Sequence, residues 1–160
     1  MGVYSDTDEY QSPVSPARLF KALAIDAHNL IPKLLPQAVK SIEFIQGDGG
    51  AGSIFQVNFI EGSQVKTLVN RVDEINEDTF TYNYTLIEGE TLKDKFTSIA
   101  HETKFEAAPV GGSISKVTNK YYLKGDVEIK EEEIKASKEK VFGIYKVVET
   151  YLLGNPDVYA

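Results

Sequence analysis

Six successive segments between residues 38 and 124 are rich in β-branched and aromatic residues, and turn residues close each of them. In residues 79–88, Phe80, Tyr82 and Tyr84 share one parity and polar residues share the other. This period of two is typical of a strand with one buried and one solvated face. Because the connections are too short for parallel crossovers, the sequence predicts an antiparallel meander.

Helical segments are predicted on either side of the meander. After a first strand at Val3–Gln11, Ser15 is placed to cap a short helix, and a second short helix is predicted at Ala27–Leu35. From Glu128 to Leu153 the apolar spacing changes to three and four residues, which predicts one helix of about 24 residues. Such a helix spans roughly 36 Å, so we expect it to lie across the sheet of a single α+β domain, residues 1–160.

Composition excludes several classes of function. The net charge of −7 argues against nucleic-acid and anionic-membrane partners, because proteins bind such surfaces through clustered Lys and Arg side chains. There are no cysteines, and the two histidines, His28 and His101, are too far apart in sequence to form a ligand pair, so we expect no metal and no cofactor. With no signal peptide and no apolar run near eighteen residues, we expect a soluble cytoplasmic protein.

The segment GDGGAGS, residues 47–53, resembles a phosphate-binding loop in its glycine content. A phosphate loop needs a following helix and a lysine, whereas the next residues, IFQVNFI, have strand periodicity. We therefore expect a strand-to-strand connection, and the acidic Asp48 makes an anion site less favourable still. The loop residues are Gly47, Asp48, Gly49, Gly50 and Gly52.

The whole chain resembles the plant pathogenesis-related class-ten family, whose best-known member is the major birch pollen allergen. The segments that carry the resemblance are MGVY, RLFKA, NLIPKLLPQAVKS, GDGGAGS, YTLIEG, GGSISK, KGDVEIKEEE and ETYLLGNPDVYA. The resemblance implies a helix-grip (START-like) fold, in which a curved seven-stranded antiparallel sheet closes around the C-terminal helix. It also implies an internal cavity for flavonoids, cytokinins or sterol-like molecules, in a protein expected to be a monomer.

We expect the cavity to be lined by residues of inward parity and by residues that match family positions. These candidates are Phe55, Val57, Phe59, Asn70, Tyr82, Tyr84, Ile99, His101, Ile114, Lys116 and Phe142. His101 is either a satisfied core histidine or a ligand-binding group, and Lys116 is either a ligand partner or a lysine at the cavity mouth. These two are also the only, weak, catalytic candidates.

Several positions depart from the family pattern. Asn70 and Tyr122 each replace a family histidine, which we expect to alter the polar lining of the cavity. A ribonuclease activity attributed to the family would need a strand glutamate and lysines after the glycine loop, and this chain lacks both. Glu149 and Tyr151 match two of the residues invoked for it, but we expect Glu149 to be a surface or loop-pairing carboxylate.

Three functions remain open from the sequence. The first is a binding protein that holds a hydrophobic or amphipathic metabolite or hormone. The second is an enzyme of specialised metabolism similar to norcoclaurine synthase, although no acid–base pair at a defined spacing supports it. The third is a stress protein or allergen with no single ligand, since a shared fold does not fix function.

Overall fold

The computed structural model describes residues 2–90, 92 and 94–160. The strands are β1 (Val3–Ser12), β2 (Val39–Gln46), β3 (Ile54–Glu61), β4 (Gln64–Asn76), β5 (Thr81–Gly89), β6 (Phe96–Ala107) and β7 (Ser113–Leu123). The helices are α1 (Pro16–Phe20), η1 (Lys21–Ile25), α2 (Ala27–Leu34) and α3 (Glu131–Gly154). The predicted order of strand, short helices, six strands and long helix is confirmed.

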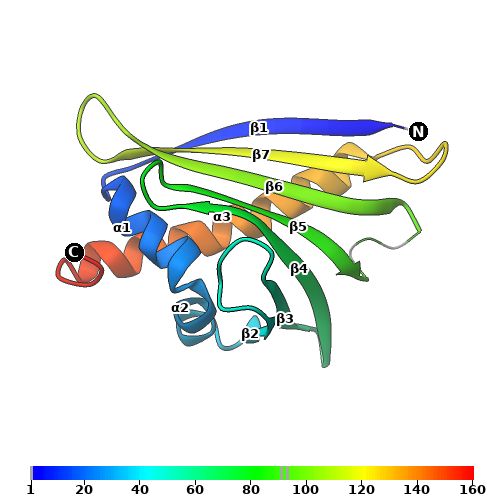
Figure 1. Cartoon of the computed structure of the whole chain (residues 1–160), viewed down its shortest axis with the longest axis horizontal. Coiled ribbons are helices and arrows are strands. Elements are labelled where there is room, and N and C mark those ends of the chain that lie inside the picture. Colours follow the sequence, from blue (N-terminus) through cyan, green and yellow to red (C-terminus); the bar gives the residue numbers. More distant parts are fainter. Residues whose placement is uncertain (1, 91, 93) are drawn as a thin grey trace.

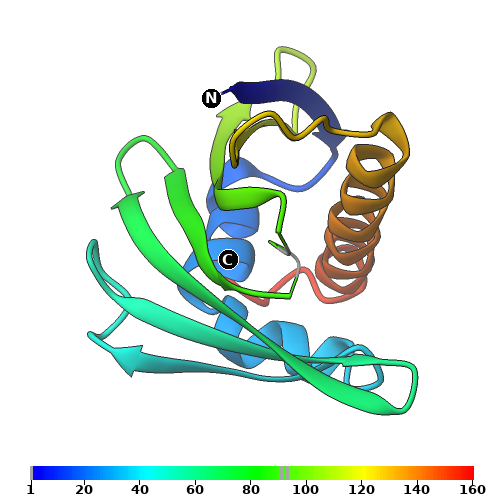
Figure 2. The ribbon, with the colours of Figure 1, turned by 90° about the vertical axis from the view of Figure 1, so that its right-hand side faces the viewer.

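All seven strands form one antiparallel sheet, in the order β1-β7-β6-β5-β4-β3-β2. Each strand from β2 to β7 pairs with the next along the chain, as a meander requires, and β1 closes onto β7. The sheet curves around α3, which runs along its concave side, and α1, η1 and α2 lie at one end (Figures 1 and 2). This is the predicted helix-grip fold.

The first helical segment begins as its sequence predicts. The Ser15 hydroxyl accepts a hydrogen bond from Arg18 N at 3.3 Å, and Pro16 occupies the first helical turn, where its missing N–H costs nothing. The segment then widens into a π-helical turn, η1, which the apolar spacing does not reveal. Asp26 separates it from α2.

Several predicted boundaries differ from the observed ones by one to three residues. Phe80 lies before β5 with φ of 52°, and its ring packs 5.6 Å from that of Phe20. Phe80 therefore ends the β4–β5 turn and lies outside the strand, although it packs against the same buried group as Tyr82. The long helix, predicted at Glu128–Leu153, runs from Glu131 to Gly154, and Asn155 follows as its cap.

Two groups of buried apolar residues lie at opposite ends of α3. The larger joins the short helices to the C-terminal half of α3, and its fully buried members include Leu19, Phe20, Val148 and Leu152. The smaller packs Ile134, near the start of α3, against Leu86, Phe96, Ile99 and Tyr121 of the sheet. The helix is thus anchored at both ends, and members of the smaller group also line the candidate site.

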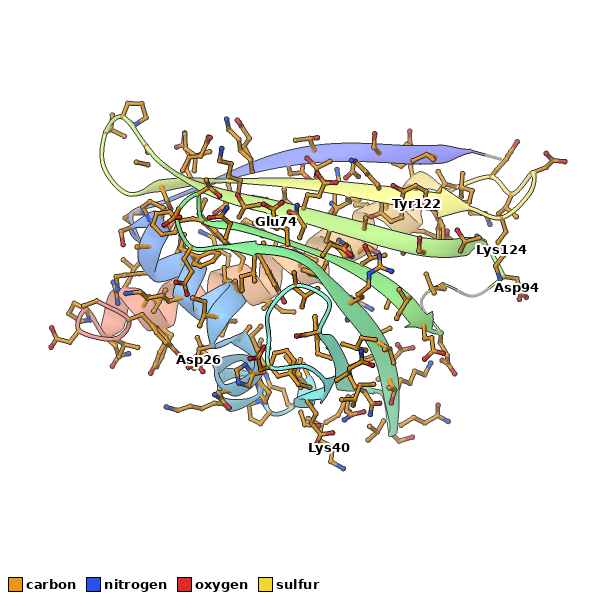
Figure 3. The ribbon with its side chains drawn as sticks, in the orientation of Figure 1. Asp26, Lys40, Glu74, Asp94, Tyr122 and Lys124 are labelled. Atoms are coloured by element: carbon orange, nitrogen blue, oxygen red, sulfur yellow. The ribbon has the colours of Figure 1, made fainter. Side chains whose placement is uncertain are left out.

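The segment after α3 is fastened to the short helices. The Arg18 guanidinium donates to the carbonyl oxygens of Leu152, Asn155 and Val158 at 2.8–3.0 Å. The Tyr159 hydroxyl donates to the Asp26 carboxylate, labelled in Figure 3. The bond to Leu152 supplies a donor to a carbonyl group in the last turn of α3, which has no intrahelical partner, and the other bonds hold the segment beyond the helix.

Candidate functional site

The register of the strands determines which side chains face α3, because directly paired residues lie on the same face of the sheet. Tyr84 pairs with His101, His101 with Asn119, and Asn119 with Asp6, which gives one inward row across four strands. The neighbouring inward row is Phe44, Phe55, Asn70, Leu86, Ile99 and Tyr121. These rows place Phe55, Asn70, Tyr84, Ile99 and His101 on the concave face. Of these five predicted lining residues, Ile99 alone lines the larger cavity described next.

A cavity of ≈ 300 Å³ lies between the sheet and the first half of α3. Its apolar wall consists of Phe59, Phe96, Ile99, Tyr121 and Ile134. Charged residues from the sheet, the β5–β6 connection and α3 surround this wall: Glu61, Lys66, Glu90, Lys95, Glu133 and Lys140. The cavity thus combines an apolar wall with more charged side chains than most small-molecule pockets, which are predominantly apolar with a few polar groups.

Aromatic rings form a continuous chain along the concave face. The ring of Phe55 lies 6.1 Å from Phe44 and 5.9 Å from Tyr84, while Tyr84 lies 5.2 Å from Tyr82 and 5.0 Å from His101. Burial raises the pKa of Tyr84 to about 12 and raises that of Tyr82 as well. Both hydroxyls therefore remain protonated at neutral pH, and neither has a hydrogen-bond partner among the described residues.

His101 belongs to a chain of polar contacts that the sequence analysis missed. Its Nδ1 lies 2.7 Å from Asn119 Oδ1, Asn119 Nδ2 donates to Asp6 Oδ1 at 3.1 Å, and Lys138 Nζ lies 3.2 Å from both Asp6 Oδ2 and Asp8 Oδ2. The chain borders a second cavity of ≈ 20 Å³. The sequence feature that could have predicted these contacts is in β1, where Asp6 and Asp8 have the same parity as Tyr10 and therefore face the same side of the sheet.

Burial lowers the pKa of His101, and it outweighs the opposing effects of the Asn119 hydrogen bond and the Asp6 charge. We expect the stability that His101 contributes to be complete above its unfolded-state pKa and to fall as the pH drops below it, since only the unfolded chain then gains the proton. Urea unfolding of the wild type and of His101→Gln between pH 7.5 and 5 measures this effect. A difference in unfolding free energy that does not vary with pH would contradict it.

Two predicted lining residues are not on the concave face. On β7 the inward positions are odd-numbered, from Ser113 to Leu123, so Ile114 and Lys116 face outward. Lys116 Nζ lies 2.8 Å from Glu106 Oε2 on the neighbouring strand, with 45% of its side chain exposed. Tyr122, labelled in Figure 3, faces outward for the same reason, and its inward neighbour Tyr121 lines the cavity.

Three other predicted residues, Val57, Phe59 and Phe142, differ in whether they line the cavity. Phe59 is part of its wall, and Val57 has the inward register through its pairing with Leu68. Phe142, in contrast, lies on the flank of α3 that faces β1, where its ring packs 5.1 Å from Tyr10 and the residue is 39% exposed. Phe142 is thus a helix-to-strand contact and does not line the ≈ 300 Å³ cavity.

The glycine-rich loop connects β2 and β3, as predicted, and it satisfies its own polar groups. The Ser53 hydroxyl accepts from Gly49 N at 3.0 Å, the Asp48 carboxylate accepts from Gly50 N at 3.3 Å, and Gly52 N donates to the carbonyl oxygen of Val72 at 2.8 Å. Gly47, with φ of +81°, passes so close to Ser53 that a β-carbon would lie 2.3 Å from its Oγ. These N–H groups are not directed outward to an anion.

Glu149 differs from the expected surface or loop-pairing carboxylate. The residue is only 6% exposed, and its partner is Lys146 of the same helix, whose Nζ lies 2.9 Å from Oε1. Oε2 is buried with no hydrogen-bond partner among the described residues. The pair does not reach the glycine loop, which leaves the nuclease hypothesis without an assembled site.

Residues 1–155 match the model of the pathogenesis-related protein Bet v 1 family. The chain belongs to this family. It is 54% identical over 159 residues to the major allergen Pru ar 1 of Prunus armeniaca, with 99% of each chain covered. The crystal structure of Ara h 8.0201 superposes with a TM-score of 0.88 at 40% identity, covering 96% of this chain and 100% of the other.

Members of the Bet v 1 fold extend beyond the allergens. Norcoclaurine synthase from Thalictrum flavum, in complex with dopamine and hydroxybenzaldehyde, matches with a TM-score of 0.72 over 96% of this chain and 88% of its own. Its identity to this chain is only 18%, so the likeness concerns the fold alone. Within the described residues, no helix is both long and apolar enough to cross a membrane.

Proposed function

We propose that this protein binds a hydrophobic or amphipathic small molecule between the sheet and α3. The observation that carries the proposal is the ≈ 300 Å³ cavity, with its apolar wall inside a charged rim. This volume lies at the lower end of the range for ligand pockets, so it suits one small aromatic or alicyclic molecule. Tyr121 and Ser137, which line the cavity, add hydroxyl groups that can orient such a ligand.

The affinity would come mainly from buried apolar surface. A ligand that buries about 200 Å² of apolar area gains roughly 5 kcal/mol, from which the cost of association must be subtracted. Even before that cost, roughly 5 kcal/mol corresponds to a dissociation constant of only about 0.2 mM, so we expect weak binding near the millimolar range and weak discrimination among ligands of similar shape. Flavonoids, cytokinins and sterol-like metabolites are the classes that the family resemblance suggests.

Fluorescence titration with N-phenyl-1-naphthylamine, followed by displacement with naringenin and kinetin, tests the proposal. We expect saturable probe binding with a stoichiometry of one, and native mass spectrometry should show the corresponding mass increase. Dissociation constants above the millimolar range for all three compounds would refute it. The expectations of a monomer and a cytoplasmic location remain predictions.

The enzymatic alternative also remains a prediction. One of its two candidate groups, Lys116, faces outward, and Lys138 on the inner side is paired with two carboxylates. Turnover of an aldehyde–amine pair that is lost in His101→Ala would support an enzyme. No arrangement among the described residues favours that reaction over binding.

A further inference from the structure

The polar chain across β1, β7 and β6 fixes the direction of each hydrogen bond in it. A carboxylate only accepts hydrogen bonds, so the Asn119 amide NH₂ group must donate to Asp6. The distance from Asn119 Nδ2 to Asp6 Oδ1 is 3.1 Å. Asn119 Oδ1, which also only accepts, then lies 2.7 Å from His101 Nδ1. In the neutral imidazole the proton is therefore on Nδ1, and Nε2 carries a lone pair.

The unprotonated nitrogen is available on the concave face. No described residue donates a hydrogen bond to Nε2. The imidazole borders the ≈ 20 Å³ cavity and not the ≈ 300 Å³ cavity, but the two cavities share Tyr121 and Ser137 in their walls. The imidazole centroid lies 5.0 Å from that of Tyr84. Burial lowers the pKa of His101, so the ring is neutral at pH 7. The His101 ring thus offers one acceptor atom next to the Tyr84 ring.

Asp6 is held in place from the other side. Lys138 of α3 lies 3.2 Å from its Oδ2, and only 11% of the Asp6 side chain is exposed. Asp8 contacts the same lysine at the same distance, but it pairs with Val117 and does not bond to Asn119. Two aspartates therefore share one cation, and only one of them is connected to His101.

We propose that Asp6, acting through Asn119, makes the ≈ 300 Å³ cavity select ligands whose donor group reaches the adjoining ≈ 20 Å³ cavity and hydrogen-bonds to His101 Nε2, with phenols as the simplest aromatic case. Asp6 is a positioning residue and does not touch the ligand. An O-methylated analogue has no proton to donate and leaves Nε2 without a partner, which lowers its affinity. The inference rests on the proposed function, because it concerns the choice among ligands of that cavity.

The tautomer can be measured in the free protein without any variant. Two-dimensional ¹⁵N–¹H NMR of the histidine side chains distinguishes a protonated Nδ1 from a protonated Nε2. We expect His101 to have the proton on Nδ1 throughout the neutral pH range. A predominant Nε2–H form, or an even mixture, would overturn the inference even if the cavity binds ligands.

Ligand selection is tested with 2-naphthol and 2-methoxynaphthalene, which share one ring system. In Asp6→Asn the new amide can donate or accept, so Asn119 is free to turn and the tautomer is no longer fixed. We expect the ratio of the two dissociation constants to move toward the methyl ether by about two- to tenfold, the range of one neutral hydrogen bond. The same variant should show mixed tautomers by NMR.

Asp8→Asn is the matched control, since it removes an equal charge from the same lysine. We expect it to retain the wild-type ratio and the wild-type tautomer. If both compounds bind but Asp6→Asn leaves their ratio unchanged, the inference fails and the proposed function stands. If neither compound binds to the wild type, the proposed function fails as well, and should Asp6→Asn not fold, the wild-type NMR measurement decides the inference.

Discussion

Replacing Ser137 with tryptophan is expected to weaken binding of N-phenyl-1-naphthylamine by about 100-fold while the protein remains folded. Ser137 lies on α3 and borders both cavities. An indole at this position would occupy space that the ligand needs, and losing about 100 Å² of apolar ligand contact costs roughly 2.5 kcal/mol. Fluorescence titration measures the affinity, and circular dichroism checks that the fold is retained.

Glu139→Trp provides the control for this prediction. Glu139 is exposed, lies two residues further along the same helix and borders neither cavity. The same side chain placed there should change the probe affinity by less than twofold. Equal losses in the two variants would indicate a general effect on α3, and undiminished binding in Ser137→Trp would place the ligand outside the cavity.

The second large effect concerns stability. Arg18→Met should lower the free energy of unfolding by about 3 kcal/mol, because it removes the charged donor to the carbonyls of Leu152, Asn155 and Val158. Methionine retains an apolar stem, so the loss reports on the hydrogen bonds more than on packing. Urea unfolding at pH 7 measures the change.

Lys21→Met serves as the comparison for Arg18. Lys21 Nζ donates to the carbonyl oxygen of Ala160 at 3.4 Å in an exposed position, so its loss should cost less than about 0.5 kcal/mol. If Arg18→Met also lowers the free energy of unfolding by less than 1 kcal/mol, water replaces the guanidinium as donor, and Arg18 does not hold the C-terminal segment. Amide hydrogen exchange across residues 152–160 would show which segment is released.

The fold was predictable from the sequence because its signals are local. The period of two between residues 38 and 124 and the helical spacing after Glu128 each follow from a short stretch of chain. β2, at Val39–Gln46, begins within one residue of the predicted start of this region. Where the prediction failed, at Phe80 and Gly154, the backbone is decided by packing against Phe20 and by the residues that follow α3.

The candidate site was only partly predictable. In residues 79–86, every second residue is aromatic or aliphatic and the residues between them are polar. This alternation identifies Tyr82 and Tyr84 as inward-facing. On β7 both parities are mixed: Ser113, Val117 and Tyr121 face inward, while Ile114 and Lys116 face outward. With no contrast between the two faces, resemblance placed Lys116 inward, and the pairing with β6 places it outward.

By itself the sequence determined the antiparallel strands, the long helix and the absence of a phosphate loop, because each depends on residues close together in the chain. Only the tertiary structure decided what lies beside His101. Asp6, Asn119 and Lys138 come from β1, β7 and α3, and they meet because the sheet closes β1 onto β7 and α3 crosses both. Strand register and the position of the helix set that meeting, and no local pattern encodes either of them.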